Sequence, residues 1–212
     1  MDVNRTEEEQ LEAMKKWWAE NGWSIVGGVV IGLAAIFGWR SWETYQQTQA
    51  EAASNLYSNL IVEMRQNKKD QARELAQKLL DEYTSTSYAV FASLMLARLD
   101  TEAGNLASAI QHLQWAMDNT KQDEFKHLAR LRMARVLLDD NKPGQALALI
   151  SNIKNQGEFA ASYEELKGDI YVRQGEIEKA KIAYQTALAG MDDGLGDNSF
   201  LQLKIDDIGR QH

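Results

Sequence analysis

The sequence predicts an all-α protein in which one transmembrane helix precedes a solenoid of helical hairpins. Three observations lead to this prediction. Residues 21–39 are nineteen residues without a charged side chain. The whole chain of 212 residues has a single proline and is rich in strong helix formers. From residue 72 onward an alanine recurs at intervals of 37, 37 and 34 residues, which is typical of repeats built from two antiparallel helices.

Residues 1–20 are expected to form a short amphipathic segment on the cytoplasmic side of the membrane helix. Thr6 and Glu9 have the Thr-x-x-Glu spacing of a capping box, which marks the start of a helix. The apolar residues that follow recur at helical spacing: Leu11, Met14, Trp17 and Trp18. This face can lie on the bilayer surface or against a partner helix, and contact with lipid is the commoner arrangement.

Residues 21–39 are the predicted transmembrane helix. At a rise of 1.5 Å per residue they cover roughly 28 Å, close to the thickness of the hydrocarbon core of a bilayer. Five of the six tryptophans lie at the two ends, where amphipathic rings meet the headgroups: Trp17, Trp18, Trp23, Trp39 and Trp42. Two alternatives fit less well. A buried core helix is usually shorter, and a cleaved signal peptide would lead into a polar region with an Ala-x-Ala site.

The charges beside this helix predict its orientation. Arg5, Lys15 and Lys16 precede it, whereas Arg40 is the only basic residue between positions 39 and 65. Basic residues that flank a membrane helix tend to stay in the cytoplasm. The amino terminus should therefore be cytoplasmic, and residues 40–212 should form a domain on the other side of the membrane.

One face of the predicted membrane helix carries only small residues. Ser24, Gly28 and Gly32 are four positions apart, and the two glycines form a G-x-x-x-G. Small residues let a second helix approach closely, which is a main source of helix association in lipid. Glycine is also common in membrane helices in general, so the alternative is that this face binds no second helix.

Residues 40–212 are expected to form a tetratricopeptide-like domain. Each of the four recurring alanines follows a short polar or glycine-containing turn: Ala72, Ala109, Ala146 and Ala180. Twelve positions before each alanine lies the residue at the helix crossing: Leu60, Ala97, Ala134 and Gly168. Small residues at the crossing and apolar residues four and seven positions after the alanine, such as Ile150 and Ile153, are the tetratricopeptide arrangement, although Leu60 in the first unit is not small. An irregular helical bundle is the alternative, and four units in one register favour the solenoid.

The chain should end in a capping helix. Residues 190–199 are rich in turn residues, and Asp197 or Ser199 is suited to cap the helix that follows. Apolar residues then recur at helical spacing: Phe200, Leu201, Leu203, Ile205 and Ile208. Such a helix would cover the last apolar face of the solenoid.

Charge and composition exclude several classes of protein. Residues 43–212 contain 25 acidic and 19 basic residues, a net charge of −6, and no clustered basic face that would bind nucleic acid. The absence of cysteine excludes a disulfide framework, a thiol nucleophile and a zinc knuckle. No Ser beside a His, no phosphate loop and no metal-ligand spacing occurs. We therefore expect a protein that is not an enzyme, with no catalytic, metal or cofactor site.

In such solenoids the first helices of successive units line a concave groove that holds a peptide or a partner helix. By register, the groove should present Tyr57, Ile61, Phe91, Leu94, Arg98, Leu131, Arg135, Leu138, Asp169 and Arg173. Arg98 and Arg135 take equivalent positions and could hold carboxylates of the bound chain. The alternatives are that the arginines are merely solvated and that Phe91 and Leu94 belong to the core.

Three segments resemble a known family: EEEQLEAMKKWWAENGWSIVGGVVIGLAAIFGWRSW (residues 7–42), LRMARVLLDDNKPGQALALI (131–150) and FLQLKIDDI (200–208). They are similar to the YfgM family of Gram-negative bacteria, ancillary subunits of the SecYEG translocon. The resemblance implies an inner-membrane protein with a periplasmic tetratricopeptide-like domain. It also implies association with SecYEG and with the membrane-anchored chaperone PpiD, in handing exported proteins to periplasmic chaperones. It implies no catalytic residue.

The sequence therefore supports two alternative hypotheses of function. In the first, the protein is a non-catalytic interaction protein that places a binding groove for a partner chaperone or for unfolded exported proteins at a protein-conducting channel. In the second, it is an envelope-assembly scaffold or a homodimeric adaptor built on the Gly28 and Gly32 face. A membrane-anchored hydrolase is disfavoured because no nucleophile constellation occurs.

Overall fold

The computed structural model describes residues 7–191 and 199–210, and nearly all of them are helical. The helices are α1 (Glu7–Arg65), α2 (Lys69–Glu82), α3 (Ser87–Glu102), α4 (Leu106–Asn119), α5 (Asp123–Asp139), α6 (Pro143–Ser151), α7 (Ala160–Gln174), α8 (Ile177–Ala189) and α9 (Ser199–Arg210), with a 3-10 turn at Gly157–Phe159. No strand occurs in these two ranges. The predicted all-α fold is confirmed. Thr6 of the expected capping box and Asp197 of the expected loop lie outside the described residues.

The chain divides into two compact units, residues 1–51 and 52–212. The first unit is the amino-terminal part of α1. This is the one helix in the described residues that is long and apolar enough to cross a membrane, and only 6% of its most apolar window is buried. Such exposure differs from the mostly buried core helix that was the alternative. The helix runs without interruption past residues 20 and 39, so the limits of the transmembrane segment stay predictions.

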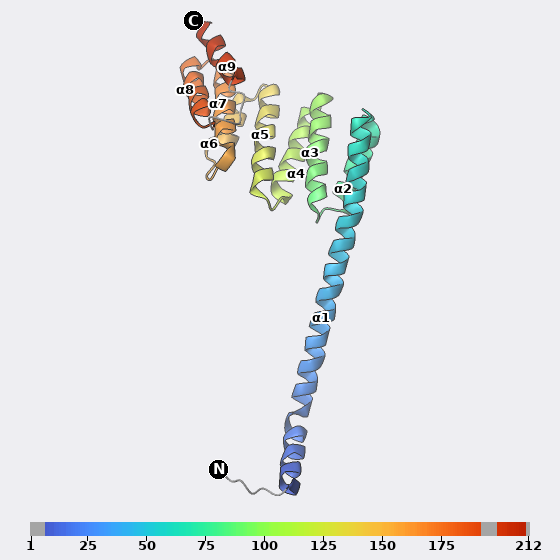
Figure 1. Ribbon diagram of the computed structural model, residues 1–212. Coiled ribbons are helices and arrows are strands. Elements are labelled where there is room, and N and C mark those ends of the chain that lie inside the picture. Colours follow the sequence, from blue (N-terminus) through green and yellow to red (C-terminus); the bar gives the residue numbers. More distant parts are fainter. Residues whose placement is uncertain (1–6, 192–198, 211–212) are drawn as a thin grey trace. The chain divides into compact units, whose positions relative to one another are not determined.

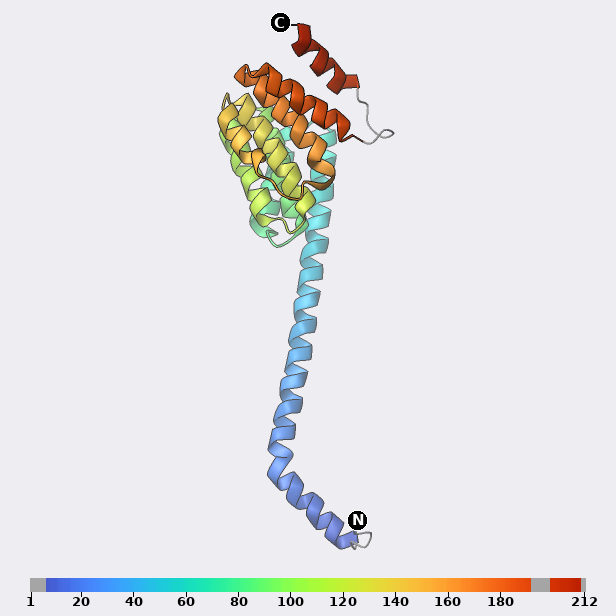
Figure 2. The same ribbon diagram turned by 90° about the vertical axis from the view of Figure 1, so that its left-hand side faces the viewer.

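The helix axis of this first unit changes direction in its dark-blue part, as both ribbon views show (Figures 1 and 2). At Gly22 the Trp18 ring packs so closely that an added Cβ would lie 3.2 Å from it. The Asn21 side-chain amide donates to the Trp17 carbonyl oxygen over 3.0 Å. Any larger residue at position 22 would require the Trp18 ring to shift by a few tenths of an ångström.

The second unit is a row of helical hairpins (Figure 1). Residues 52–65 of α1 pair with α2, and the pairs α3 with α4, α5 with α6 and α7 with α8 follow. This is the predicted order of two helices per repeat. One helix is shorter than expected: α6 ends at Ser151, where the Ser151 hydroxyl donates to the Leu147 carbonyl oxygen over 2.6 Å. Ile153 therefore lies beyond α6, although it still packs against the core.

All four hairpin turns are built alike. The same turn position has a positive φ in every repeat: Asn67, Gly104, Asn141 and Gly175. In each turn the next amide donates to the carbonyl oxygen five residues earlier, over 2.8–3.0 Å. This is the Schellman motif, which satisfies the last carbonyl groups of a helix and needs a residue that tolerates a left-handed backbone. Asparagine and glycine are the residues that do so most easily.

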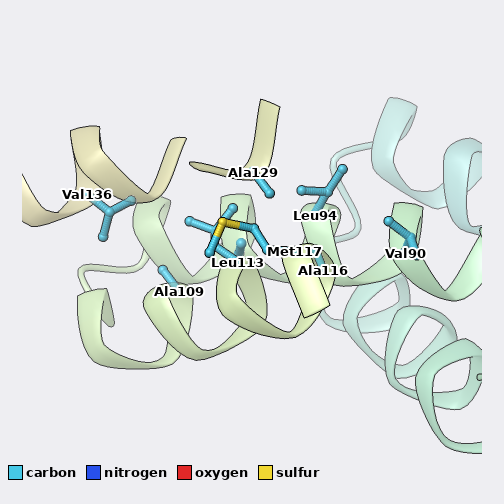
Figure 3. Packing of buried hydrophobic residues seen from close by; sticks show 9 residues of the cluster. Val90, Leu94, Ala109, Leu113, Ala116, Met117, Ala129 and Val136 are labelled. Atoms are coloured by element: carbon cyan, nitrogen blue, oxygen red, sulfur yellow. The ribbon is translucent and has the colours of Figure 1, made fainter. Parts of the chain in front are cut away.

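The predicted helix crossings are buried. Leu60 and Ala134 are 0% exposed, Ala97 is 2% exposed and Gly168 is buried. The four recurring alanines are each 0% exposed as well: Ala72, Ala109, Ala146 and Ala180. The fourth crossing is the tightest, because a Cβ atom added at Gly168 would lie 2.3 Å from Cε1 of Tyr184. Between α3, α4 and α5 the core is continuous: Leu113 and Met117 of α4 lie among Leu94 of α3 and Ala129 of α5 (Figure 3).

The last helix covers the end of the solenoid as predicted. Leu201 and Ile208 of α9 are 2% and 4% exposed and pack against Ala180, Tyr184 and Ala187 of α8. Phe200 and Leu203 were expected to share this apolar face, yet both remain mostly exposed. Only the side of α9 that contains Leu201 and Ile208 therefore forms the cap.

Candidate functional site: a groove between α3 and α5

Two adjoining hollows lie along the first helices of the repeats. Their volumes are about 380 and 360 Å³, and they share Leu94, Arg98 and Arg132. We call them together the α3–α5 groove. Its lining also includes Tyr57, Phe91, Met95, Ala97, Thr101, Glu102, Leu113, Phe125, Leu128, Arg135, Val136 and Asp139. Leu113 and Val136, which belong to the core cluster that Figure 3 shows, also line the first hollow.

One end of the groove is aromatic. The ring centroids of Tyr57 and Phe91 are 5.7 Å apart, and those of Phe91 and Phe125 are 5.0 Å apart. Tyr88 packs beside the first pair, 5.6 Å from Tyr57. Burial, and to a lesser extent Tyr88, raises the pKa of Tyr57, so its hydroxyl stays neutral. These rings offer an apolar surface in which only part of each ring is covered by the fold.

The other end of the groove carries three guanidinium groups. Arg98 donates from Nε to Oε1 of Glu102 over 2.8 Å, and Glu102 also accepts a hydrogen bond of 2.6 Å from Lys69. The hydrogen bonds from Lys69 and then Arg98 lower the pKa of Glu102. Glu102 is therefore a carboxylate already shared by two cations.

Arg132 and Arg135 have no such partner. Among the residues that the structure describes, neither has a carboxylate within 4.0 Å. Burial lowers the pKa of Arg132, and repulsion from Arg135 and Arg98 lowers it further. An arginine remains protonated in proteins, so Arg132 is a cation beside two other cations that line the same hollow.

The structure brings together five of the predicted groove residues and separates the others. Tyr57, Phe91, Leu94, Arg98 and Arg135 all line the groove. Leu131 and Leu138 lie instead in the neighbouring core, 3% and 9% exposed. Ile61, Asp169 and Arg173 line neither hollow; Arg173 is exposed on α7, with Nη1 at 3.5 Å from the Leu138 carbonyl oxygen.

Four residues that line the aromatic hollow were not predicted: Met95, Phe125, Leu128 and Arg132. The reason is geometric. Equivalent positions in these repeats are 37 residues apart, whereas the residues that share the groove from opposite sides are 34 apart, about one helical turn less. The pairs are Phe91 with Phe125, Leu94 with Leu128, and Arg98 with Arg132. A search at this shorter interval would have found them, together with the step from Tyr57 to Phe91.

The corresponding face at the end of the solenoid is closed. Lys204 of α9 lies 2.7 Å from Oδ1 of Asp169 and 2.8 Å from Oε1 of Glu165, both on α7. Tyr184 donates its hydroxyl to Asp169 over 2.8 Å. Burial alone would lower the pKa of Lys204, but its hydrogen bonds to Asp169 and Glu165 outweigh burial and raise the pKa. Burial first, and then Asp169, raises the pKa of Tyr184.

The two described histidines with close partners make structural contacts. His127 Nδ1 lies 2.8 Å from the Tyr163 hydroxyl, which joins α5 to α7. His112 Nε2 lies 3.4 Å from Oδ2 of the buried Asp100, and burial lowers the pKa of His112. In the part of the chain that the structure describes, no group of three or more His, Cys, Asp or Glu side chains could hold a metal ion.

The small face of α1 is open in this chain. Ser24, Gly28 and Gly32 are exposed, and no atom lies within 4 Å of a Cβ added at either glycine. A second helix could therefore approach this face without displacing any side chain of the described residues. Its use as a helix-packing face stays a prediction.

Comparisons with known proteins agree with this architecture. The family model of the tetratricopeptide repeat-like domain matches residues 15–210. A protein of Escherichia coli K12 named ancillary SecYEG translocon subunit is 30% identical over 98% of this chain and 99% of its own length. Proteins of the same name from Haemophilus influenzae (30% identical; 85% of this chain, 88% of the relative) and Neisseria gonorrhoeae (29%; 98% and 100%) are also similar.

Proposed function

We propose a function from one premise: the chain belongs to the tetratricopeptide repeat-like family whose curated members include ancillary SecYEG translocon subunits. On that premise the protein is a non-catalytic interaction protein of the bacterial inner membrane that associates with the SecYEG translocon. Its one candidate membrane helix among the described residues supports a single-pass anchor, and its repeats support a role in binding other proteins.

The orientation and the binding role are further parts of the proposal. The excess of basic residues before the apolar helix favours a cytoplasmic amino terminus and a periplasmic carboxy-terminal domain. In this arrangement the α3–α5 groove receives segments of exported unfolded polypeptides and links them to periplasmic chaperones. PpiD is the proposed chaperone partner, as the resemblance of the amino-terminal segment implies.

The observation that supports this role most is the composition of the groove. Partly exposed aromatic rings lie beside Arg132 and Arg135, neither of which has a carboxylate within 4.0 Å among the described residues. A surface used only for packing would be covered or neutralised, as it is where α9 meets α7. A partly apolar, cationic groove suits a polypeptide that is not yet folded.

Site-specific photocrosslinking in intact membranes tests this function. A photoreactive phenylalanine analogue at Tyr57 or Arg98 should crosslink to an exported polypeptide that is stalled in the translocon, or to PpiD. The same analogue at the exposed Lys181 of α8 is the matched control and should give neither product. If positions 57 and 98 label nothing that position 181 does not, the groove is not the binding surface.

A second function, a homodimeric adaptor or envelope-assembly scaffold that does not depend on the translocon, is favoured by the open face at Gly28 and Gly32. Replacing both glycines with isoleucine should then abolish self-association in the membrane while the repeats stay folded. Gly27→Ile, in the same helix but off this face, is the control and should leave association intact. Unchanged association of the double variant would reject the scaffold.

A further inference from the structure

We propose that the α3–α5 groove recognises an extended polypeptide segment in which a large apolar side chain is followed three residues later by an acidic side chain. This specificity rests on the peptide-binding role proposed above and gives it a defined ligand. The acidic group is a side chain and not a chain terminus, because the groove continues past the guanidinium groups to Thr101 and Asp139, so the bound chain has room to continue.

The apolar side chain belongs at the aromatic end. The hollow there is lined by Tyr57, Phe91, Phe125, Leu128 and Met95. Phe91 and Phe125 meet in an edge-to-face contact at 5.0 Å, so α3 and α5 are in contact at this hollow, which is an open depression of about 360 Å³. Such a depression accepts one aromatic or large aliphatic side chain, which would bury apolar surface on both partners.

The acidic side chain belongs at the cationic end. Arg98, Arg132 and Arg135 gather there, and the described residues provide one carboxylate partner, Glu102, which contacts Arg98 and also binds Lys69. Bringing one further carboxylate to Arg132 would relieve the repulsion among three cations and add a charge-assisted hydrogen bond. The protein as a whole has a net charge of −8, so the charge of this cationic site is opposite in sign to that of the whole chain.

The spacing follows from the helices. Phe91 and Arg98 on α3 are seven residues apart, and so are Phe125 and Arg132 on α5. Seven residues of α-helix rise about 10.5 Å. A chain in polyproline II geometry, a major conformer of unfolded chains, returns to the same side every third residue after about 9.3 Å. An apolar residue and an acidic residue three positions apart therefore match the two ends of the groove.

The closed end of the solenoid shows how the equivalent charged position is satisfied within one chain. By the repeat spacing, Asp169 of α7 takes the position of Arg98 and Arg135. There the helix α9 supplies the opposite charge, Lys204, which binds Asp169, and a buried apolar side chain, Leu201, which packs against α8. At α3 and α5 the charge is positive, and the complementary apolar and acidic groups must come from another polypeptide.

The test measures binding of short fluorescent peptides to the full chain in detergent micelles. All peptides are acetylated and amidated and have a glycine and serine background. The first has phenylalanine followed three residues later by glutamate. In the others the glutamate is replaced by glutamine, the phenylalanine by serine, or the glutamate is moved to the seventh position after the phenylalanine. An uncapped form of the glutamine peptide tests a terminal carboxylate.

We expect the first peptide to bind about tenfold more tightly than its glutamine form, the typical effect of one charge-assisted hydrogen bond. The ratio of the affinities of the glutamate and glutamine peptides should fall to about one in Arg132→Gln and should become smaller in Arg135→Gln. Arg130→Gln, a change on the same helix outside the groove, should leave this ratio unchanged. Phe125→Ala should weaken every phenylalanine peptide and leave the ratio unchanged. Far-ultraviolet circular dichroism establishes that each variant is folded.

Several results would overturn the proposal. The first group concerns the ligand: equal binding of the glutamate and glutamine peptides, or tighter binding of the uncapped glutamine peptide. A peptide with the seven-residue spacing that binds more tightly than the first peptide would indicate a helical ligand. The remaining two are an affinity ratio of the glutamate and glutamine peptides that is unchanged in Arg132→Gln, and no binding by any peptide. If one of these occurs while positions 57 and 98 still crosslink to exported chains, the groove has another specificity and the proposed function stands. If crosslinking is also absent, both fail.

Discussion

Two faces of this solenoid differ: the face between α7 and the capping helix α9 is closed, whereas the face between α3 and α5 is open. Where α7 meets α9, Asp169 and Glu165 face Lys204 over 2.7 and 2.8 Å, and the tyrosine ring of the fourth repeat fills the space at Gly168. Where α3 meets α5, arginines face arginines and two hollows stay open. The repeat architecture is the same in both places, so the side chains alone decide whether the face closes.

The difference separates stability from binding. Opposite charges and a buried tyrosine make the α7–α9 face a structural contact, because every charged group there has a partner inside the chain. In the α3–α5 groove, by contrast, Arg132 and Arg135 have no carboxylate within 4.0 Å among the described residues and the rings are partly exposed. These groups gain contacts when another molecule binds. Changes at the first face should therefore act on stability, and changes at the second on binding. Four predictions test this division, from the largest effect to the smallest.

The largest effect is expected for Gly168→Ala. The added Cβ would lie 2.3 Å from the Tyr184 ring, and that ring is 3% exposed and hydrogen-bonded to Asp169. It cannot move without losing packing and its hydrogen bond, so the free energy of unfolding should fall by about 2–3 kcal/mol. Thermal denaturation followed by circular dichroism measures this.

Gly144→Ala is the matched control for that variant. Gly144 lies in α6 with no atom within 4 Å of an added Cβ, so alanine there should leave stability unchanged or raise it by up to about 1 kcal/mol. Equal melting curves for Gly168→Ala and the wild type would show that the α7–α8 crossing is not tight in solution.

The second effect is expected for Lys204→Met. The variant keeps much of the aliphatic stem but leaves Asp169 and Glu165 facing each other without a cation. Since Lys204 is only about one-fifth exposed, we expect a loss of about 1–2 kcal/mol in the free energy of unfolding. Lys181→Met, an exposed change on α8, should have almost no effect. A similar loss in both variants would mean that the ion pair contributes nothing.

The third effect is a dependence on alkaline pH. The pKa of Lys204 is raised by its carboxylate partners, although burial opposes them, so its contribution is complete below the unfolded pKa of about 10.4 and is lost as the pH rises through the folded value. The Tyr184 pKa is raised as well, with the same sign. Unfolding midpoints in urea should therefore fall above about pH 10.5, and the fall should be smaller in Lys204→Met. Equal slopes in the two proteins would contradict this assignment.

The sequence predicted the repeats because their signals are local. An asparagine or glycine at each turn and a buried alanine five residues later define the register, and both follow from backbone geometry and close packing. It predicted Tyr57, Phe91, Leu94, Arg98 and Arg135 of the groove for the same reason.

The remaining groove residues depend on how neighbouring repeats are offset. The 37-residue repeat spacing assigns Leu131 to the groove as the equivalent of Leu94. In the structure Leu128 lines the hollow together with Leu94, and Leu131 belongs to the next core cluster. The ion pairs of Lys204 could not be predicted from the sequence either, because its partners on α7 lie 35 and 39 residues earlier in the chain. Whether α9 turns Leu201 or Phe200 inward depends on tertiary packing, and periodicity alone does not decide it.

The smallest effect on stability, and the sharpest test of the comparison, is expected for Arg132→Glu. A glutamate at this position would face Arg98 across the groove and Arg135 three residues along the same helix, which converts the open face into one with opposite charges. Stability should rise by up to about 1 kcal/mol, and this gain should vanish in 1 M salt, where the Debye length is about 3 Å. Arg130→Glu makes the same change of net charge outside the groove and should bring no gain, because it only adds to the acidic excess of the chain. Binding should move the other way: the peptide with phenylalanine and glutamate should lose its advantage over the glutamine form. A gain in stability without this loss of discrimination would show that charge closes the face but does not select the ligand.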